Sequence, residues 1–182
     1  MKKFKWLLLL AAITLLGITH AALNIDAKKS TITIKAMQMN VPINAQFKQF
    51  KAMIDYDPKA PTATKAQVDI DISSFDLGDA EYNKEVLKKE WFNAAQFPTA
   101  SYISTSVKPA GNGKMTASGK LTIKGKTMDV SFPVTINQQG TSIIFDGDLP
   151  ISRLAFHIGE GEWSDTGMVA DEVLIKFHIV TQ

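Results

Sequence analysis

The 182-residue sequence contains no cysteine. A disulfide and a lipid-modified amino-terminal cysteine are therefore both excluded, so packing alone must stabilise the folded chain. A chain of this length can bury enough apolar surface to do so without a metal. Its composition, 45% hydrophobic and 21% charged residues, is typical of one globular domain.

A surplus of basic residues is also missing. The nominal net charge is +2, but Lys2, Lys3 and Lys5 belong to an amino-terminal segment that we expect to be removed. Without them, 17 basic residues stand against 18 acidic ones. A nucleic-acid-binding protein would carry a basic excess, so we exclude nucleic acid as a partner.

Long apolar runs are absent except near the amino terminus. Leu7 to Ile18 is uncharged, follows the three lysines and precedes the small-residue sequence Thr19-His20-Ala21. An uncleaved anchor would need about 20 apolar residues, whereas this shorter run suits a secretory signal peptide. We predict a cleavable signal peptide at residues 1–21, export to the periplasm, and a single β-barrel domain at residues 22–182.

Catalytic motifs are absent as well. The sequence has no Gly-x-Ser-x-Gly elbow, no Gly-rich phosphate loop and no His-Glu-x-x-His pattern. The polar residues that could form a metal or acid–base cluster are His157, His178, Asp146, Asp148 and Glu160. Met37 and Met39 share a strand face and could bind Cu(I), although packing is the commoner role. We expect no enzyme, no metal and no cofactor.

Most of what remains alternates apolar and polar residues with the period of a β-strand. About eight such segments follow one another through short turns, which predicts an antiparallel meander. In one segment the apolar residues are odd-numbered up to Phe47 and even-numbered from Phe50. Such a change of phase needs a bulge or bend, here near Lys48-Gln49. A two-sheet sandwich is the alternative, but the bend favours an all-β, eight-stranded antiparallel barrel.

Several inward positions of this barrel carry small side chains. They are Ala45, Ala52, Ala66, Ala117, Gly119 and Gly147. Small residues along apolar walls would leave a channel for an apolar ligand. Alternatively they are bend positions whose gaps are filled by neighbouring phenylalanines, and composition alone leaves both interpretations open.

Residues 76–101 interrupt the strands with a helical pattern. The apolar residues at helical spacing are Tyr82, Val86, Leu87 and Trp91. They share one face of a short amphipathic helix, and Asp79 stands where its N-cap would be. Phe92 and Phe97 follow, and Pro98 prevents further helix. This segment is expected to be a lid over an apolar opening.

Five segments of the chain resemble the YceI-like family. They are the residues 47–52, 68–75, 87–98, 119–130 and 152–159. In order and spacing they cover nearly all of the chain after the signal peptide. The resemblance implies an extended, lipocalin-like antiparallel barrel, exported by bacteria, that binds a long polyisoprenoid or other acyl-chain lipid along its axis. The family commonly has Arg-Asp and His-Leu ahead of its Phe-Phe element, and this chain departs from that pattern at residues 82–87 and at Trp91.

The candidate residues for lining or capping the channel are mostly aromatic. They are Phe47, Phe50, Phe75, Leu87, Trp91, Phe92, Phe97, Phe132, Phe145 and Phe156. Each could instead be ordinary core. Arg153 is the only arginine in the sequence, and a guanidinium can grip a carboxylate or phosphate through two hydrogen bonds. It either holds a polar head group at the barrel mouth or forms a buried ion pair that fixes the stretch after Pro150, and we favour the ion pair.

The sequence and the resemblance together predict a periplasmic protein that sequesters or carries a long isoprenoid-type lipid, such as a quinone or a polyprenyl phosphate. The lipid is the ligand, and no other cofactor is expected. The alternative is a non-enzymatic interaction protein with a filled barrel, which docks a membrane redox protein through an aromatic patch. A homodimer is compatible with either function.

Overall fold

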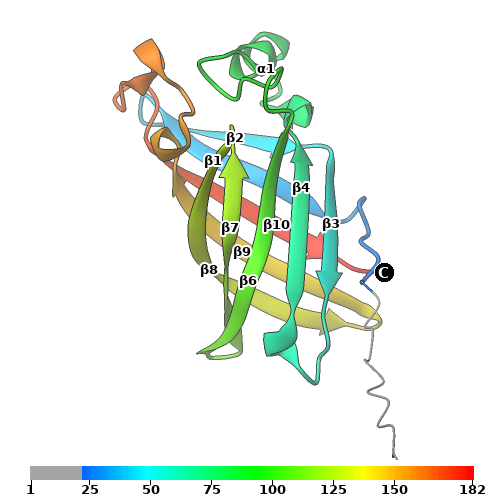
Figure 1. The fold of residues 1–182 in the computed structure, drawn as a ribbon. Helices are drawn as coiled ribbons and strands as arrows, with labels where there is room; N and C mark the ends of the chain where they lie inside the picture. The colour runs from blue at the N-terminus through cyan, green and yellow to red at the C-terminus, as the bar shows by residue number, and fades with distance from the viewer. Residues whose placement is uncertain (1–21) are drawn as a thin grey trace, which may run out of the picture.

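A computed structural model describes residues 22–182, so the predicted signal peptide, residues 1–21, lies outside the described residues. The elements in chain order are β1 (Thr31–Gln38), β2 (Val41–Phe47), β3 (Phe50–Asp55), η1 (Pro61–Ala63), β4 (Lys65–Asp71), η2 (Ile72–Ser74), β5 (Phe75–Asp76), α1 (Ala80–Val86), β6 (Thr99–Gly111), β7 (Lys114–Ile123), β8 (Lys126–Gln139), β9 (Ser142–Ser152), η3 (Leu154–Phe156), η4 (Gly161–Ser164) and β10 (Glu172–Val180). The strands form one curled antiparallel sheet in the order β3-β4-β6-β7-β8-β9-β10-β1-β2-β5 (Figure 1).

The sheet curls into a barrel at the predicted bend. β2 pairs with β1, whereas β3 pairs with β4, and only Lys48 and Gln49 separate β2 from β3. Main-chain hydrogen bonds extend the pairing up to the bend at both ends of the sheet. Lys48 N donates to Ser74 O (3.1 Å) next to the β2–β5 pair, and Asp71 N donates to Gln49 O (3.0 Å) next to the β3–β4 pair. The prediction of an antiparallel barrel is confirmed. Its eight strands become ten because the bend separates β2 from β3 and η2 separates β4 from β5.

The sequence alternation is misleading in one strand, β6. Ser101, Ile103 and Val107 are spaced as if they shared a face, but Ile103 is 51% exposed and Tyr102 faces the interior. A register shift against β7 between Ser104 and Ser106 reverses the phase, so Val107 is buried nonetheless. A bulge of this kind moves each later side chain to the opposite face.

The helix is confirmed but is shorter than its apolar pattern suggested. Asp79 caps α1, because its Oδ1 accepts hydrogen bonds from Glu81 N (2.8 Å) and Tyr82 N (3.1 Å). The prediction that Trp91 shares the helical face of Tyr82 was wrong. α1 ends at Val86. The chain then turns back, and Val86 O accepts a hydrogen bond from Phe92 N (3.0 Å).

Two connections cover one end of the barrel. One carries α1 and the turns up to Pro98, and the other is the segment 153–171 between β9 and β10 (Figure 1). They meet where Gly159 N and Glu160 N both donate to Glu90 O at 2.9 Å. No helix within residues 22–182 has the length and apolar character that a membrane crossing requires.

Candidate functional site

The covered end of the barrel contains an apolar cavity of about 160 Å³, which we call the upper cavity. Among the residues expected to line a channel, those in its wall are Phe47, Phe75, Trp91, Phe92 and Arg153. Tyr82 and Val86 of α1 also line it, so the helix forms part of the cavity wall. The predicted lid therefore lies against an apolar opening.

Aromatic rings pack tightly around the upper cavity. Phe75 lies 5.3 Å from Phe47 and 5.5 Å from Phe92, measured between ring centroids. Trp91 lies 5.4 Å from Trp163, which comes from the other covering connection. Such edge-on and tilted ring contacts add stability to that gained from the buried area alone. They hold the two connections against the barrel.

A second apolar cavity of about 130 Å³, the lower cavity, lies further along the barrel. The predicted residues Phe132 and Phe145 line it, together with Tyr102 and Phe177. The residues that line both cavities are Ile70, Leu121 and Ile175. The two cavities are therefore neighbours along one apolar interior.

The small inward residues divide between the two roles that the sequence left open. Ala45 lines the upper cavity, and Ala66 and Ala117 line the lower one. Gly119 and Gly147 instead lie under aromatic rings, because a Cβ atom there would collide with Tyr102 or Phe177. The alanines leave space for a ligand, whereas the glycines let large rings pack against the wall. Ala52 lines neither cavity.

Two buried polar atoms of this interior have no hydrogen-bond partner within residues 22–182. They are the Tyr102 hydroxyl and Trp91 Nε1. Burial also raises the pKa of Tyr102 to about 12, so the phenol is neutral at physiological pH. A buried donor without an acceptor is destabilising, and both side chains belong to the walls of the cavities.

Arg153 has neither of the two roles that were weighed for it. Arg153 is 2% exposed, and the five N–H bonds of its guanidinium go to main-chain carbonyl oxygens. These acceptors are Ala170 (3.1 Å), Ile158 (2.8 Å), Gly159 (3.0 Å), Trp163 (2.7 Å) and Val169 (2.7 Å). Because a guanidinium has five donors in all, none is left for a head group or for a carboxylate. Arg153 fixes the stretch after Pro150, as predicted, but through carbonyls rather than an ion pair.

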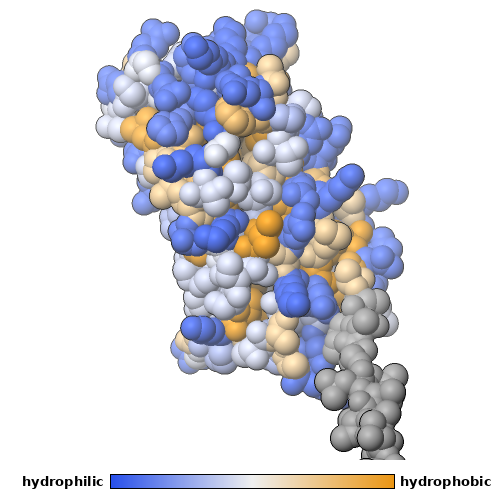
Figure 2. Space-filling view, viewed as in Figure 1, coloured by the Kyte–Doolittle hydropathy of each residue, from blue (hydrophilic) through white to orange (hydrophobic). Residues whose placement is uncertain are grey.

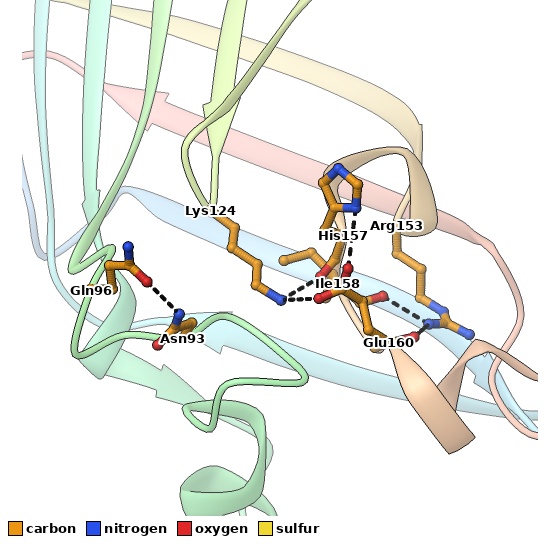
Figure 3. Close-up of polar contacts among 8 residues, drawn as sticks. Asn93, Gln96, Lys124, Arg153, His157, Ile158 and Glu160 are labelled. Atoms are coloured by element: carbon orange, nitrogen blue, oxygen red, sulfur yellow. Dashed lines mark hydrogen bonds and ion pairs between the residues drawn. The ribbon is translucent and has the colours of Figure 1, made fainter.

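A second polar contact ties the same stretch to the barrel (Figure 3). Lys124, in the turn between β7 and β8, donates to His157 O (2.6 Å) and Glu160 Oε2 (3.0 Å). The lysine side chain is only 7% exposed. Its hydrogen bond is the main reason why the pKa of Glu160 lies below its ordinary value. Like Arg153, Lys124 positions the covering segment, but unlike Arg153 it lines neither cavity.

Four of the predicted ligand residues do not line either cavity. Phe50 and Leu87 are half-buried and pack against the core. Phe156 is buried within the core, and Phe97 packs against Gly125 in the turn between β7 and β8. Phe50, Leu87 and Phe156 therefore belong to the core, whereas Phe97 packs at the turn outside it.

Tyr102, Trp163 and Phe177 line the cavities but were not among the predicted site residues. Tyr102 was missed because the bulge in β6 hides its phase. Trp163 lies in an irregular segment with no periodicity to interpret. Phe177 stands between Lys176 and His178 in the alternating pattern of its strand, and its aromatic character, which it shares with Phe132, was the available signal.

The polar residues considered for a metal site form separate ion pairs instead of one cluster. His178 Nδ1 lies 2.6 Å from Asp146 Oδ1, and Lys176 Nζ lies 2.7 Å from Asp148 Oδ1. The described residues hold no group of three or more His, Cys, Asp or Glu side chains that could bind a metal. Met37 and Met39 are both exposed, so neither packs in the core.

Comparison with known proteins identifies relatives of this chain. The family model of the YceI-like domain matches residues 23–181. The crystal structure of Burkholderia cenocepacia BcnA is 48% identical in sequence, with a TM-score of 0.85 over 87% of this chain and 100% of that one. A UPF0312 protein of Shewanella sp. (strain ANA-3) is 34% identical over 103 residues, so the match spans about half (54%) of that relative.

A more distant structure has the same fold. It is a polyisoprenoid binding domain from Saccharophagus degradans, implicated in plant cell wall breakdown. It has 17% sequence identity and a TM-score of 0.65 over 90% of this chain and 99% of that one. At this identity the likeness concerns the fold alone.

Proposed function

This chain belongs to the YceI-like domain family, and from that premise we propose that it is a lipid-binding protein of the periplasm. It sequesters or carries a long isoprenoid-type lipid, such as a quinone or a polyprenyl phosphate, along the barrel axis. The observation that carries this proposal is the apolar interior, in which two neighbouring cavities share Ile70, Leu121 and Ile175.

The size and lining of the cavities suit a chain of small apolar units. An apolar cavity of about 150 Å³ in another protein stays dry and binds benzene, so each cavity here has room for a group the size of an isoprene unit. The lower cavity is lined by aliphatic and aromatic side chains with only Thr64, Ser104 and Tyr102 as polar members. Each methylene group moved from water into such a site contributes about 0.8 kcal/mol.

The polar end of the lipid belongs at the upper cavity. Gln38, Glu85 and Trp163 line it, and Trp91 carries a donor without a partner. A quinone carbonyl or a phosphate oxygen can accept from the Trp91 indole after a small rotation of the ring.

The alternative function required a filled barrel. Two cavities lined by apolar side chains favour a ligand-binding interior over a filled one. Docking of a membrane redox protein has no comparable support among the described residues.

Intrinsic fluorescence tests this function, because the tryptophans after residue 21 are Trp91 and Trp163, and both line the upper cavity. Titration with a short-chain ubiquinone should quench their emission in a saturable way with one ligand per chain. An isoprenoid hydrocarbon without a quinone ring should compete and restore the emission. Linear quenching that no competitor reverses would contradict the proposal.

A further inference from the structure

The β1–β2 hairpin ends in an unusual turn. Its two loop residues, Met39 and Asn40, both have positive φ, 48° and 63°, and Gln38 pairs with Val41 beside them. Such two-residue turns favour Asn or Gly at both loop positions. Methionine is a poor residue for this conformation, because its Cβ crowds the main chain. Met39 is nevertheless 65% exposed, so burial of its side chain in the described chain does little to offset the strain.

The tip of the hairpin is apolar and uncharged. Residues 36–47 contain no charged side chain, although 21% of the whole sequence is charged. Three exposed apolar side chains gather at the tip: Met37, Met39 and Val41. Met37 lies on the outer face and Val41 continues the inner face, so both faces of the tip are apolar.

The inner face of β2 connects this tip with the upper cavity. Ile43, Ala45 and Phe47 point inward and line that cavity. Val41 is the next residue of the same row, and it is 60% exposed. An apolar path therefore runs without interruption from the cavity to the surface. Opposite Val41, Gln38 belongs to the cavity wall as well.

The tip is held firmly at the covered end of the barrel. Met39 N donates to Met168 O and Ala170 N donates to Met37 O, both at 2.9 Å. Figure 1 shows the hairpin reaching the segment 153–171 at the same end as α1. The face of this end seen in Figure 2 is mainly hydrophilic, with small hydrophobic areas between. Apolar side chains on a fixed tip are thus available to a partner without refolding.

We propose that the tip of the β1–β2 hairpin docks on a lipid bilayer, with Met39 and Val41 entering the interface. This inference rests on the proposed function, since a lipid that leaves the upper cavity along the row from Phe47 to Val41 needs an apolar medium at its end. The uncharged tip fits a bilayer, because charged side chains are strongly disfavoured there. Docking by apolar contact on a neutral tip is insensitive to salt.

Flotation with phosphatidylcholine vesicles tests the docking. The samples are the exported protein and its variants Met39→Asn and Met53→Gln, with the same amino terminus verified by mass. Met39→Asn removes the apolar side chain, while asparagine suits the turn. It should raise the denaturation midpoint and lower vesicle binding about tenfold, as expected for the loss of one large apolar side chain from the interface. Met53→Gln, at an exposed methionine in β3, is the matched control and should float like wild type.

The outcomes separate docking from ligand binding. The proposal is supported if wild type and Met53→Gln float with the vesicles in both low and high salt while Met39→Asn does not. Equal flotation of all three proteins, or none, would overturn it, including the case in which the tip contacts a protein instead. If the three proteins bind a short-chain ubiquinone equally but none floats, docking fails while the proposed function stands. If none binds the quinone, a polyprenyl phosphate or a fatty acid in solution, the proposed function fails whatever the flotation result.

Discussion

The guanidinium of Arg153 lies 5.8 Å from the ring centroid of Trp91, so the single buried arginine joins the two connections that cover the barrel end. The guanidinium donates its hydrogen bonds to five carbonyl oxygens of the segment 158–170. One face of the guanidinium lies over the ring of Trp91, which is part of the wall of the upper cavity. Burial lowers the pKa of Arg153 below its ordinary value, and Asp171 partly offsets this. The charge is thus held by carbonyl dipoles and a ring face.

Replacing Arg153 tests this positioning role. Arg153→Lys keeps the charge but cannot reach five carbonyls, so several buried acceptors lose their donor. We expect a loss of about 3–5 kcal/mol in the free energy of unfolding, measured by urea denaturation. The near-ultraviolet circular dichroism of Trp91 and Trp163 should weaken as well. Lys120→Gln, which breaks an exposed ion pair with Asp129, is the control and should change stability by less than about 1 kcal/mol. Unchanged stability with reduced ligand affinity would instead assign Arg153 to the head group.

Filling the lower cavity should separate stability from binding. Ala117 lines that cavity, and Ala117→Leu adds three carbons to the open space. The variant should be as stable as wild type or more stable by about 1 kcal/mol, as for other cavity-filling changes. Its affinity for a long-chain quinone should fall at least about tenfold, because one lost methylene contact contributes about 0.8 kcal/mol and several are displaced. Ala110→Leu, at an exposed position of β6, should leave affinity unchanged. Undiminished affinity of Ala117→Leu would mean that the chain does not enter the lower cavity.

The sequence predicted those features of this site that depend on local periodicity. The bend at Lys48-Gln49 was visible because the period of two changes phase within one strand. The inward position of Tyr102 was not visible in the sequence, because the face on which it lies depends on a bulge that arises where β6 pairs with β7. The partners of Arg153 were also invisible, because carbonyl groups are common to every residue and only the folded path of residues 158–170 brings them together.

The hydroxyl of Tyr102 should be dispensable for stability. It is buried without a partner within the described chain, so folding removes it from water without compensation. Tyr102→Phe should raise the free energy of unfolding of the ligand-free protein by about 1 kcal/mol, measured by urea denaturation. Tyr56→Phe, in an aromatic pair with Phe145, provides a comparison at a tyrosine without this orphaned hydroxyl. A destabilised Tyr102→Phe would show that the hydroxyl has an acceptor, such as an ordered water.

Asp76 should make stability depend on acidic pH. Hydrogen bonds from Lys48 (2.6 Å), Asn83 (2.8 Å) and Gly78 (3.0 Å) lower its pKa well below the ordinary value. The unfolded chain therefore binds a proton more readily, and stability rises with pH. The contribution is complete above the unfolded pKa of about 3.9 and is lost as the pH falls below it.

Asp76→Asn provides the measurement. The variant should be less stable than wild type above about pH 4 and should show a flatter pH dependence below it, followed by thermal denaturation from acidic to neutral pH. Asp129→Asn, whose side chain is 82% exposed, should retain the wild-type pH profile. An Asp76→Asn variant as stable as wild type at neutral pH would contradict the role of this carboxylate, which joins β5 to Lys48 and to Asn83 of α1.

The most direct test of the lipid-binding account is native mass spectrometry of the protein recovered after export and purified without detergent, followed by solvent extraction of any adduct. The account predicts a one-to-one adduct whose extracted ligand fragments with the repeating mass of isoprene units, and whose head group is read from the same spectrum. A ligand-free mass that stays unchanged after incubation with quinones, polyprenyl phosphates and fatty acids would contradict it.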